Sequence, residues 1–186
     1  MRRLAESLRG LESPRIVLRR LEQRDAPVLE EMVRDAAVYR YLPAFLYERR
    51  YPDIRTVIDG LYGECLDESL ILGIFENGRF CGLAEWYDLR PEPRSVSIGN
   101  RLLSRCWGKG LASETLQLML RGLEEQTDIQ CVTATTMTDN LASARVLRNN
   151  GFVKTAEHAA EDWGFETPMT VDVWMKSIGN GRIDNT

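Results

Sequence analysis

Apolar residues recur along the chain with two periods, one typical of β-strands and one typical of α-helices. Alternating or continuous β-branched runs predict strands. We expect strands over residues 16–21, 70–75, 80–87, 95–103, 131–137 and 170–176, and another that begins at Gly151. The second and third of these runs flank Asn77-Gly78, a dipeptide that favours the tight turn of a β-hairpin.

Apolar positions three and four residues apart predict four helices between these strands. The first two helices begin directly after Asp25 and Asp53, and the third and fourth span residues 112–125 and 140–150. Both aspartates stand directly before a helical run, where a carboxylate can accept backbone N–H groups, so we expect them to be N-caps. The apolar stripe of the second helix extends to Leu66, and the aromatic-rich segment 39–51 before it is expected to be a loop.

The alternation of strands and helices indicates one α/β domain with a mixed sheet. A chain of 186 residues fits one domain of ordinary size. Hydrophobic residues make up 44% of the chain and charged residues 28%, which is typical of a soluble globular protein and excludes the disordered and fibrous classes.

Charge and apolar patterning argue against two classes of partner. Lys and Arg total 24 against 28 Asp and Glu, a net charge of −4, and the chain has no basic block, so we expect no nucleic-acid partner. No run approaches the roughly 18 apolar residues that a membrane span needs. The segment 1–11 lacks the apolar core of a secretory signal, and we expect no membrane partner.

Cysteine and histidine content narrows the chemistry further. The four cysteines are scattered without a C-x-x-C pair, so we expect reduced thiols in the cytoplasm rather than a disulfide framework. His158 is the only histidine, which argues against most zinc sites and nucleophile triads, and we expect no metal. A Cys106–His158 pair acting in acyl hydrolysis is the remaining nucleophilic alternative.

The most informative segment joins the fourth expected strand to the third expected helix. It contains Gly108 and Gly110 directly before the helix, and such a turn lets backbone N–H groups approach phosphate oxygens. The segment is not a G-x-x-x-x-G-K-[ST] phosphate loop, because Leu103 stands at the first glycine position and Gly110 follows Lys109. A dinucleotide fingerprint would need glycine where Ser113 stands.

Two patterns in this region resemble the signatures of the GNAT superfamily of acyl-CoA N-acyltransferases. The run R-C-W-G-K-G from Arg105 matches [QR]-x-x-G-x-[GA], the pyrophosphate loop of that family. One strand later, the run from Asn140 to Phe152 matches N-x-x-[AS]-x-x-x-[YL]-x-x-x-G-F. The opening I-V-L-R-R-L and the run G-K-G-L-A-S-E are similar to the RimJ/RimL branch, which acetylates N-terminal amines of ribosomal proteins.

The resemblance covers residues 15–177 and implies a fold as well as an activity. The implied architecture is a twisted, mixed and mostly antiparallel sheet of about six to seven strands, with helices on both faces and a V-shaped cleft between two splayed strands. Residues 1–14 would then form an N-terminal extension and residues 178–186 a flexible tail. The implied activity is transfer of an acetyl group from acetyl-CoA, as co-substrate, to a primary amine in a ternary complex.

The resemblance also assigns the donor site. Backbone N–H groups of residues 107–112 would hold the pyrophosphate, and residues 101–103 would pair with the pantetheine arm as an added strand. The cofactor-binding residues expected on this basis are Arg101, Leu102, Leu103, Arg105, Cys106, Trp107, Gly108, Lys109, Gly110, Leu111, Ala112, Ser113, Asn140, Ser143 and Arg145. Asn140 would bind pantetheine and can also cap its own helix. Trp107 either stacks on adenine or packs on its helix, and Arg145 either binds a phosphate or is solvated.

Acyl transfer needs a neutral amine and a leaving thiolate that can be stabilised, so we looked for an acid and a base. Many family members carry a tyrosine near the sulfur where this chain has Leu147, which leaves Ser143 as the candidate partner of the sulfur. The glutamate common on the fourth strand of RimJ-like sequences is Ser97 here. Glu85 on the preceding strand, Glu114 in the first turn of the loop helix and an ordered water are the alternatives for the base.

Two further points stay open at this stage. The acceptor can be a peptide N-terminus or a small-molecule amine, and the resemblance allows a homodimer because many relatives dimerise. The absent tyrosine and fourth-strand glutamate also leave a second function: a non-catalytic acyl-CoA-binding sensor or scaffold.

Overall fold

The computed structural model describes residues 1–42, 51–163 and 167–179. Within them the strands form one sheet in the order β1-β2-β3-β4-β5-β7-β6. The strands are β1 Ile16–Arg19, β2 Ser69–Glu76, β3 Arg79–Arg90, β4 Ser95–Leu102, β5 Cys131–Met137, β6 Val153–Glu161 and β7 Met169–Ser177. All neighbouring pairs are antiparallel except β4 and β5, which confirms the expected mixed, mostly antiparallel sheet.

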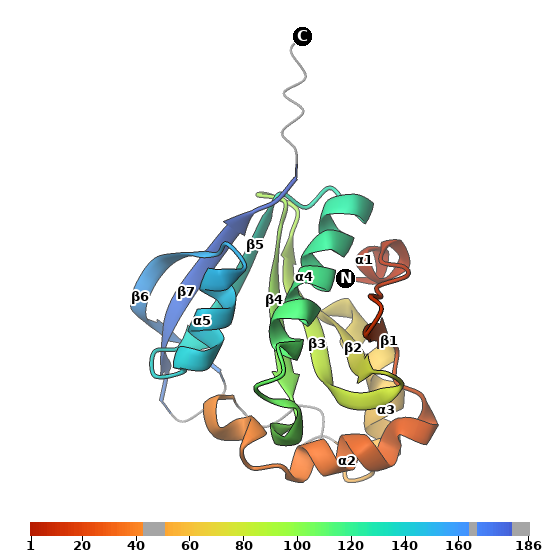
Figure 1. The fold of residues 1–186 in the computed structure, drawn as a ribbon. Coiled ribbons are helices and arrows are strands. Elements are labelled where there is room, and N and C mark those ends of the chain that lie inside the picture. Colours follow the sequence, from red (N-terminus) through yellow and green to blue (C-terminus); the bar gives the residue numbers. More distant parts are fainter. Residues whose placement is uncertain (43–50, 164–166, 180–186) are drawn as a thin grey trace.

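The helices cover the sheet and frame one opening in it. They are α1 Arg2–Ser7, α2 Ala26–Arg34, α3 Ile54–Tyr62, α4 Leu111–Gln126 and α5 Leu141–Asn149, with 3₁₀ turns η1 Gln23–Asp25, η2 Val38–Tyr41, η3 Cys65–Asp67 and η4 Ser104–Cys106. Figure 1 shows α4 and α5 side by side in front of the sheet, with α2 and α3 at its lower end. Residues 70–75 on β2 are buried on both sides of the strand, as expected for a sheet covered on both faces.

The hairpin between β2 and β3 forms at the predicted turn. Asn77 and Gly78 both have positive φ, 49° and 78°, which is the conformation that a type I′ turn requires. The two strands pair from Glu76 and Arg79 back to Ser69 and Tyr87. This rigid hairpin carries β3, and with it Glu85, into the middle of the sheet.

Asp53 and Asp25 differ in what they cap. The Asp53 carboxylate accepts the Arg55 N–H, 2.9 Å away, and caps α3 as predicted. Asp25 stands at the predicted N-cap position of α2, with proline in the first turn, but its side chain makes no capping bond to that helix. The Asp25 carboxylate turns back to accept the Glu22 N–H at 2.8 Å and to pair with Arg19 at 2.7 Å, so it closes η1 instead.

Two local features lie outside the helices expected from the sequence. The apolar stripe that was predicted to run to Leu66 breaks after Tyr62, and its last part lies in η3. The segment before β1 contains α1, which buries Leu4 against the core. Gly122 of α4 leaves room for the residues that follow α1, because a Cβ there would lie 2.5 Å from a methyl carbon of Leu11 and 3.2 Å from one of Leu8. Of the segment 39–51, expected to be a loop, residues 43–50 lie outside the described residues.

Candidate active site

The parallel strands β4 and β5 stay paired over a short length and then separate. Their register covers three pairs, ending at Ser97 and Thr133, whose hydroxyl oxygens are hydrogen-bonded 2.7 Å apart. Beyond this point β4 continues to Leu102 with β3 alone, and β5 continues to Met137 with β7 alone. The edge of β4 over residues 98–102 therefore has backbone N–H and C=O groups that no strand satisfies.

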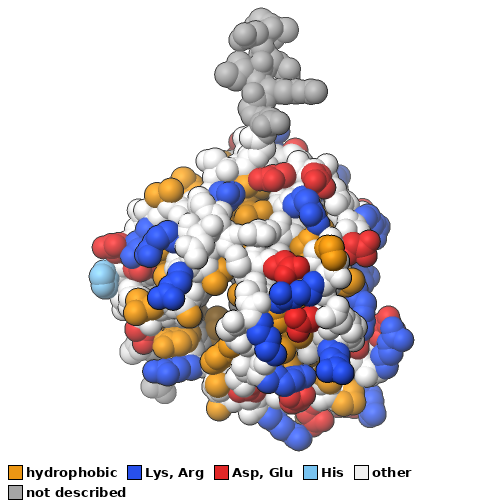
Figure 2. Space-filling view, viewed as in Figure 1, with side chains coloured by type: hydrophobic (Ala, Val, Ile, Leu, Met, Phe, Trp, Pro, Cys, Tyr) orange, Lys and Arg blue, Asp and Glu red, His pale blue; other side chains and the backbone are white. Residues whose placement is uncertain are grey.

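A cleft of about 1040 Å³ occupies this opening. Its volume is at the upper end of the usual range for small-molecule sites. Residues of β3, β4, β5, η2, α4 and α5 line it, and Figure 2 shows the surface hollowed between α4 and α5, with apolar side chains at the margin. Backbone edges and apolar walls of this kind suit an extended ligand with amide groups along its length.

The glycine turn opens into the cleft at the start of α4. Gly108 and Gly110 have φ values of 73° and 78°, a region that residues with a Cβ rarely adopt, and a Cβ on either would meet no atom within 4 Å. The first N–H groups of an α-helix have no intrahelical acceptor, and Gly110, the N-cap residue of α4, offers them no side-chain acceptor either. Open space beside uncapped N–H groups at a positive helix end fits the pyrophosphate of acetyl-CoA.

The residues expected at the donor site divide into two groups. Those that line the cleft are Arg101, Leu102, Cys106, Trp107, Gly108, Gly110, Leu111, Ala112, Ser113, Asn140 and Ser143. Those that do not are Leu103, Arg105, Lys109 and Arg145.

Three residues of the second group support the loop from behind. The Arg105 guanidinium pairs with Glu31 of α2 at 2.9 Å. Lys109 Nζ donates to the Arg105 carbonyl oxygen at 2.8 Å, and Leu103 is buried. Arg145 is exposed on α5. Arg105, Lys109 and Leu103 hold the turn in shape, whereas no contact among the described residues joins Arg145 to the turn, and none of the four lines the opening.

Trp107 and Ser113 are fixed by hydrogen bonds at the edge of the cleft. The Trp107 indole N–H donates to the Leu102 carbonyl oxygen at 2.8 Å, while half of the residue stays exposed. Ser113 Oγ accepts from Asn150 Nδ2 at 2.8 Å, which ties the first turn of α4 to the end of α5. The indole is therefore held as part of the wall, with one side facing solvent.

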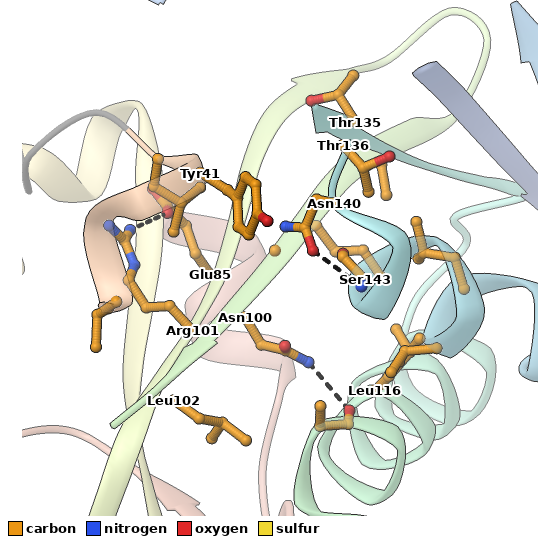
Figure 3. Close-up of a pocket in the computed structure, with 18 of the residues that line it drawn as sticks. Tyr41, Glu85, Asn100, Arg101, Leu102, Leu116, Thr135, Thr136, Asn140 and Ser143 are labelled. Carbon is orange, nitrogen blue, oxygen red and sulfur yellow. Dashed lines mark hydrogen bonds and ion pairs between the residues drawn. The ribbon is translucent and has the colours of Figure 1, made fainter. Parts of the chain in front are cut away.

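The second signature meets the first across the opening. Asn140 caps α5, its Oδ1 accepting the Ser143 N–H at 3.1 Å. Figure 3 shows its amide nitrogen directed into the cleft, toward the side of Tyr41. Leu147, at the position of the family tyrosine, is buried and lines the same wall. Asn140 can thus cap its helix through oxygen and bind a ligand through nitrogen at once.

Glu85 and Arg101 form an ion pair in the wall of the cleft. The Arg101 guanidinium lies 2.8 Å from Glu85 Oε2, and the side chains are 14% and 23% exposed. Glu85 stands opposite Gly99 in the β3–β4 register, so both project from the same face of the sheet. A Cβ at Gly99 would meet nothing within 4 Å, which leaves open space above the Glu85 carboxylate. Figure 3 shows Tyr41 across that space.

Glu114 faces away from the cleft. Its Oε1 accepts the Ser13 hydroxyl at 2.7 Å, and its Oε2 lies 3.6 Å from Arg15 Nε. It is not among the residues that line the opening. The first turn of α4 thus directs this carboxylate toward the segment before β1, where it supports the fold.

Several residues that line the cleft were missed from the sequence, because they come from segments without a motif. They are Tyr87, Asn100, Leu116, Thr135, Thr136 and Glu161. Asn100 Nδ2 donates to the Ala112 carbonyl oxygen at 3.1 Å and so fixes α4 to β4 (Figure 3). Burial raises the pKa of Tyr87 to about 12, against the opposing effect of its hydrogen bond with Thr135, so its phenol stays protonated. Strand alternation from Glu85 could have identified Tyr87, which lies two residues further along β3 and projects from the same face of the sheet.

The hydrolase alternative is not supported by the geometry. Cys106 is buried beside Cys81, whose pKa burial raises to about 11. His158 lies on β6 at the edge of the sheet, separated from β4 by β5 and β7. The sheet order therefore keeps the thiol and the imidazole apart.

The part of the chain that the structure describes contains neither a metal-binding group nor a membrane-spanning helix. In residues 1–42, 51–163 and 167–179, no group of three or more His, Cys, Asp or Glu side chains could hold a metal ion. Within the same ranges, no helix combines the length and the apolar character needed to cross a membrane.

Comparison with known proteins adds a family and several relatives. The model of an acetyltransferase (GNAT) domain matches residues 15–153. An uncharacterized N-acetyltransferase, p20, from Bacillus licheniformis is 25% identical over 170 residues, which is 90% of this chain and 94% of that protein.

Solved structures share the fold at lower identity. A RimL ribosomal-protein α-N-acetyltransferase in complex with coenzyme A aligns with a TM-score of 0.77 at 21% identity, covering 89% of this chain and 96% of that one. A spermidine N-acetyltransferase from Vibrio cholerae, in complex with CoA and spermine, aligns with a TM-score of 0.71 at 15% identity, covering 89% and 96%. These similarities confirm the predicted fold class.

Proposed function

This chain belongs to the GNAT acetyltransferase family, and we propose that it moves an acetyl group from acetyl-CoA to a primary amine by direct attack within a ternary complex. The match of the family's domain to residues 15–153 makes the chain an acetyl-CoA-dependent acyltransferase. The observation that carries the detailed assignment is the uncapped glycine turn at the start of α4, which opens into the space between β4 and β5.

The donor is held mainly by backbone groups. N–H groups of residues 108–112 bind the pyrophosphate, and Arg101 and Leu102 at the free edge of β4 pair with the pantetheine amides. The expected contributions of Trp107 and Leu103 are dropped, because the Trp107 N–H donates to the Ser104 carbonyl oxygen at 3.1 Å and the Leu103 N–H to the Cys81 carbonyl oxygen at 2.8 Å. Asn140 Nδ2 donates to the same arm while its oxygen caps α5. An acetyl thioester bound in this way supplies an activated acyl carbon close to the end of the splay, and a backbone N–H there polarises its carbonyl oxygen.

Glu85 is the proposed base. An amine is mostly protonated near pH 7, so it must lose a proton before it attacks the thioester carbon. Glu85 accepts that proton, directly or through a water, in the open space above Gly99. The Arg101 contact leaves the second carboxylate oxygen of Glu85 for this role. Glu114 is not part of the proposal, because Ser13 and Arg15 engage its carboxylate outside the cleft.

Ser143 is the proposed partner of the leaving sulfur. It lines the cleft in the first turn of α5, and its hydroxyl can donate to a thiolate. The buried Leu147 offers no proton, so thiolate departure depends on Ser143 and on solvent.

The acceptor is either the N-terminus of a protein or a small-molecule amine. The names of the two solved relatives include one acceptor of each class: a ribosomal protein acetylated on its α-amine, and spermidine. We also propose that the protein works in the cytoplasm, which its four free cysteines support, and that it can form a homodimer. A mass-spectrometric screen of peptides and polyamines distinguishes the two classes of acceptor.

The first experiment is thermal unfolding with and without acetyl-CoA, on the native chain and on Gly108→Trp. Ligand at about 100 times its dissociation constant stabilises a protein by about 2.7 kcal/mol, a shift of several degrees. We expect this shift in the native chain and its loss in the variant. No shift in the native chain would contradict the donor assignment.

The same samples test the sensor alternative. A shift with acetyl-CoA combined with no acetylation of any amine in the screen would favour a non-catalytic acyl-CoA-binding module. Release of free CoA only in the presence of an amine would favour the enzyme.

A further inference from the structure

Arg15, which precedes β1, reaches across to the glycine turn. Its Nη2 donates to the Lys109 carbonyl oxygen at 2.7 Å, although the two residues are 94 positions apart in the chain. Lys109 stands between Gly108 and Gly110 and does not line the cleft. Arg15 therefore contacts the turn on the side opposite to the opening.

This contact fixes the direction of one backbone N–H group. In a trans peptide unit the carbonyl oxygen and the N–H of the next residue point in opposite directions. A Lys109 oxygen held by Arg15 behind the turn directs the Gly110 N–H forward, and Gly110 lines the cleft. The orientation of that peptide unit decides whether the N–H meets a bound anion.

The turn needs such an anchor because glycine does not select one orientation. A flip of the Lys109–Gly110 peptide unit changes ψ of Lys109 and φ of Gly110, and glycine accepts positive and negative φ about equally. After a flip the carbonyl oxygen would face the anion and repel it. A charged guanidinium on the carbonyl oxygen favours the orientation observed.

Arg15 is itself held from two sides. Its Nε lies 3.0 Å from Glu76 at the end of β2 and 3.6 Å from Glu114 on α4. Glu114 in turn accepts the Ser13 hydroxyl, and Ser13 Oγ accepts the Ile16 N–H at 2.9 Å. Glu114 is therefore linked to the turn indirectly, through its ion pair with Arg15.

We propose that Arg15 is a positioning residue for the donor, which orients the Lys109–Gly110 peptide unit so that its N–H binds the pyrophosphate. The inference rests on the proposed donor site. Arg15 touches neither the acyl group nor the acceptor, so its effect is confined to binding of the part of the donor that carries phosphate.

The test compares two donors in the full-length protein: acetyl-CoA and S-acetylpantetheine, which lacks the pyrophosphate. Arg15→Met removes the hydrogen bond, and Arg15→Lys keeps the charge near Glu76 and Glu114. We expect Arg15→Met to lower kcat/KM for acetyl-CoA about tenfold, through KM, and to leave kcat/KM for S-acetylpantetheine within twofold. For acetyl-CoA, kcat/KM of Arg15→Lys is expected to lie between the values of the native chain and of Arg15→Met.

Arg121→Met is the matched control. Arg121 Nη2 donates to the Glu12 carbonyl oxygen at 2.8 Å, the same type of bond to the segment before β1, but away from the turn. It should change kcat/KM for neither donor. Circular dichroism and thermal unfolding show whether each variant is folded. If Arg15→Met does not fold, the comparison of Arg15→Lys with the native chain provides the test.

The outcomes separate the inference from the function on which it rests. Equal losses with both donors, or no loss with either, would overturn the positioning role while leaving the acetyltransferase assignment intact. A native protein that acetylates no amine with either donor, and binds no CoA by calorimetry, would overturn the proposed function itself.

Discussion

The proposed donor end of the cleft is formed mainly by backbone atoms around the glycine turn, residues 106–113, whereas the proposed acceptor end is formed by side chains from separate parts of the chain. The donor end depends on two glycines with positive φ and on an uncapped helix start. The acceptor end depends on the side chains of Tyr41, Glu85 and Arg101, which come from η2, β3 and β4.

This difference predicts how each end responds to substitution. A backbone site tolerates changes of side-chain chemistry but not a change of φ, since only the conformation directs its N–H groups. A side-chain site keeps its shape after a conservative substitution but loses its chemistry. The predictions below run from the largest expected effect to the smallest.

Gly110→Val should abolish the donor end. Valine at φ 78° is strained by roughly 1–2 kcal/mol, and its side chain would project into the space left for the ligand. The loss of two or more charge-assisted hydrogen bonds should lower kcat/KM for acetyl-CoA at least about 100-fold. Steady-state kinetics at fixed acceptor concentration measures this effect.

Gly78→Val is the control for strain alone. Gly78 also has φ 78° and open space at its Cβ, but it lies in the β2–β3 turn. Gly78→Val should lower the melting temperature about as much as Gly110→Val does, because the strain is the same, but it should not change kcat/KM for acetyl-CoA. Similar kinetics for the two variants would contradict a backbone-built donor site.

Glu85→Gln should disable the acceptor end while leaving donor binding intact. Glutamine still accepts from Arg101 but cannot take a proton from the amine, so kcat should fall about 100-fold, within the usual range for loss of a general base. The dissociation constant for CoA, measured by calorimetry, should stay within about twofold.

Glu30→Gln is a suitable comparison for that variant. It removes a Glu–Arg pair of 2.6 Å on the surface of α2, and activity should persist. Full activity in Glu85→Gln would instead assign proton removal to water.

Asn140→Asp should separate capping from donor binding. Aspartate is as good an N-cap as asparagine, so the melting temperature should hold, but it has no N–H to donate. We expect KM for acetyl-CoA to rise about tenfold. Asn140→Ala should raise KM similarly and also cost about 1 kcal/mol of stability. A rise in KM with alanine but not with aspartate would indicate that Asn140 acts only as an N-cap and does not bind the donor.

Asp25→Asn should lower the stability of the fold without acting directly on the donor end or the acceptor end of the cleft. Burial opposes ionisation of Asp25, but the hydrogen bonds from Arg19 and Glu22 outweigh it and hold the pKa of Asp25 below its usual value. A lowered folded-state pKa stabilises the fold above the unfolded pKa, near 4, and this stabilisation is lost as pH falls through the folded value.

Denaturant unfolding at several pH values measures this effect. The variant should be less stable than the native chain by about 1–3 kcal/mol at pH 7, and the difference should shrink below about pH 4. Activity per folded molecule should not change. A constant difference at all pH values would contradict the role of the ionised carboxylate.

Most elements of the fold could be predicted because their signals are local. The turn at Asn77-Gly78 and the cap at Asp53 depend on neighbours within a few residues, and both were confirmed. Asp25 shows the limit of this reasoning, since Arg19 and the Glu22 N–H compete with the helix end for one carboxylate. The helix α1 has six residues, too few for periodicity to identify.

The sequence by itself determined the glycine turn at the start of α4, the proposed donor end of the site, because a contiguous motif specifies a backbone conformation suited to an anion. Only the tertiary structure decided the rest. The register of β3 against β4 set Glu85 opposite Gly99, the packing of β1 against β2 brought Arg15 to the turn, and the first turn of α4 directed Glu114 away from the cleft. Contacts between residues far apart in the chain depend on how whole elements pack, and no local pattern encodes them.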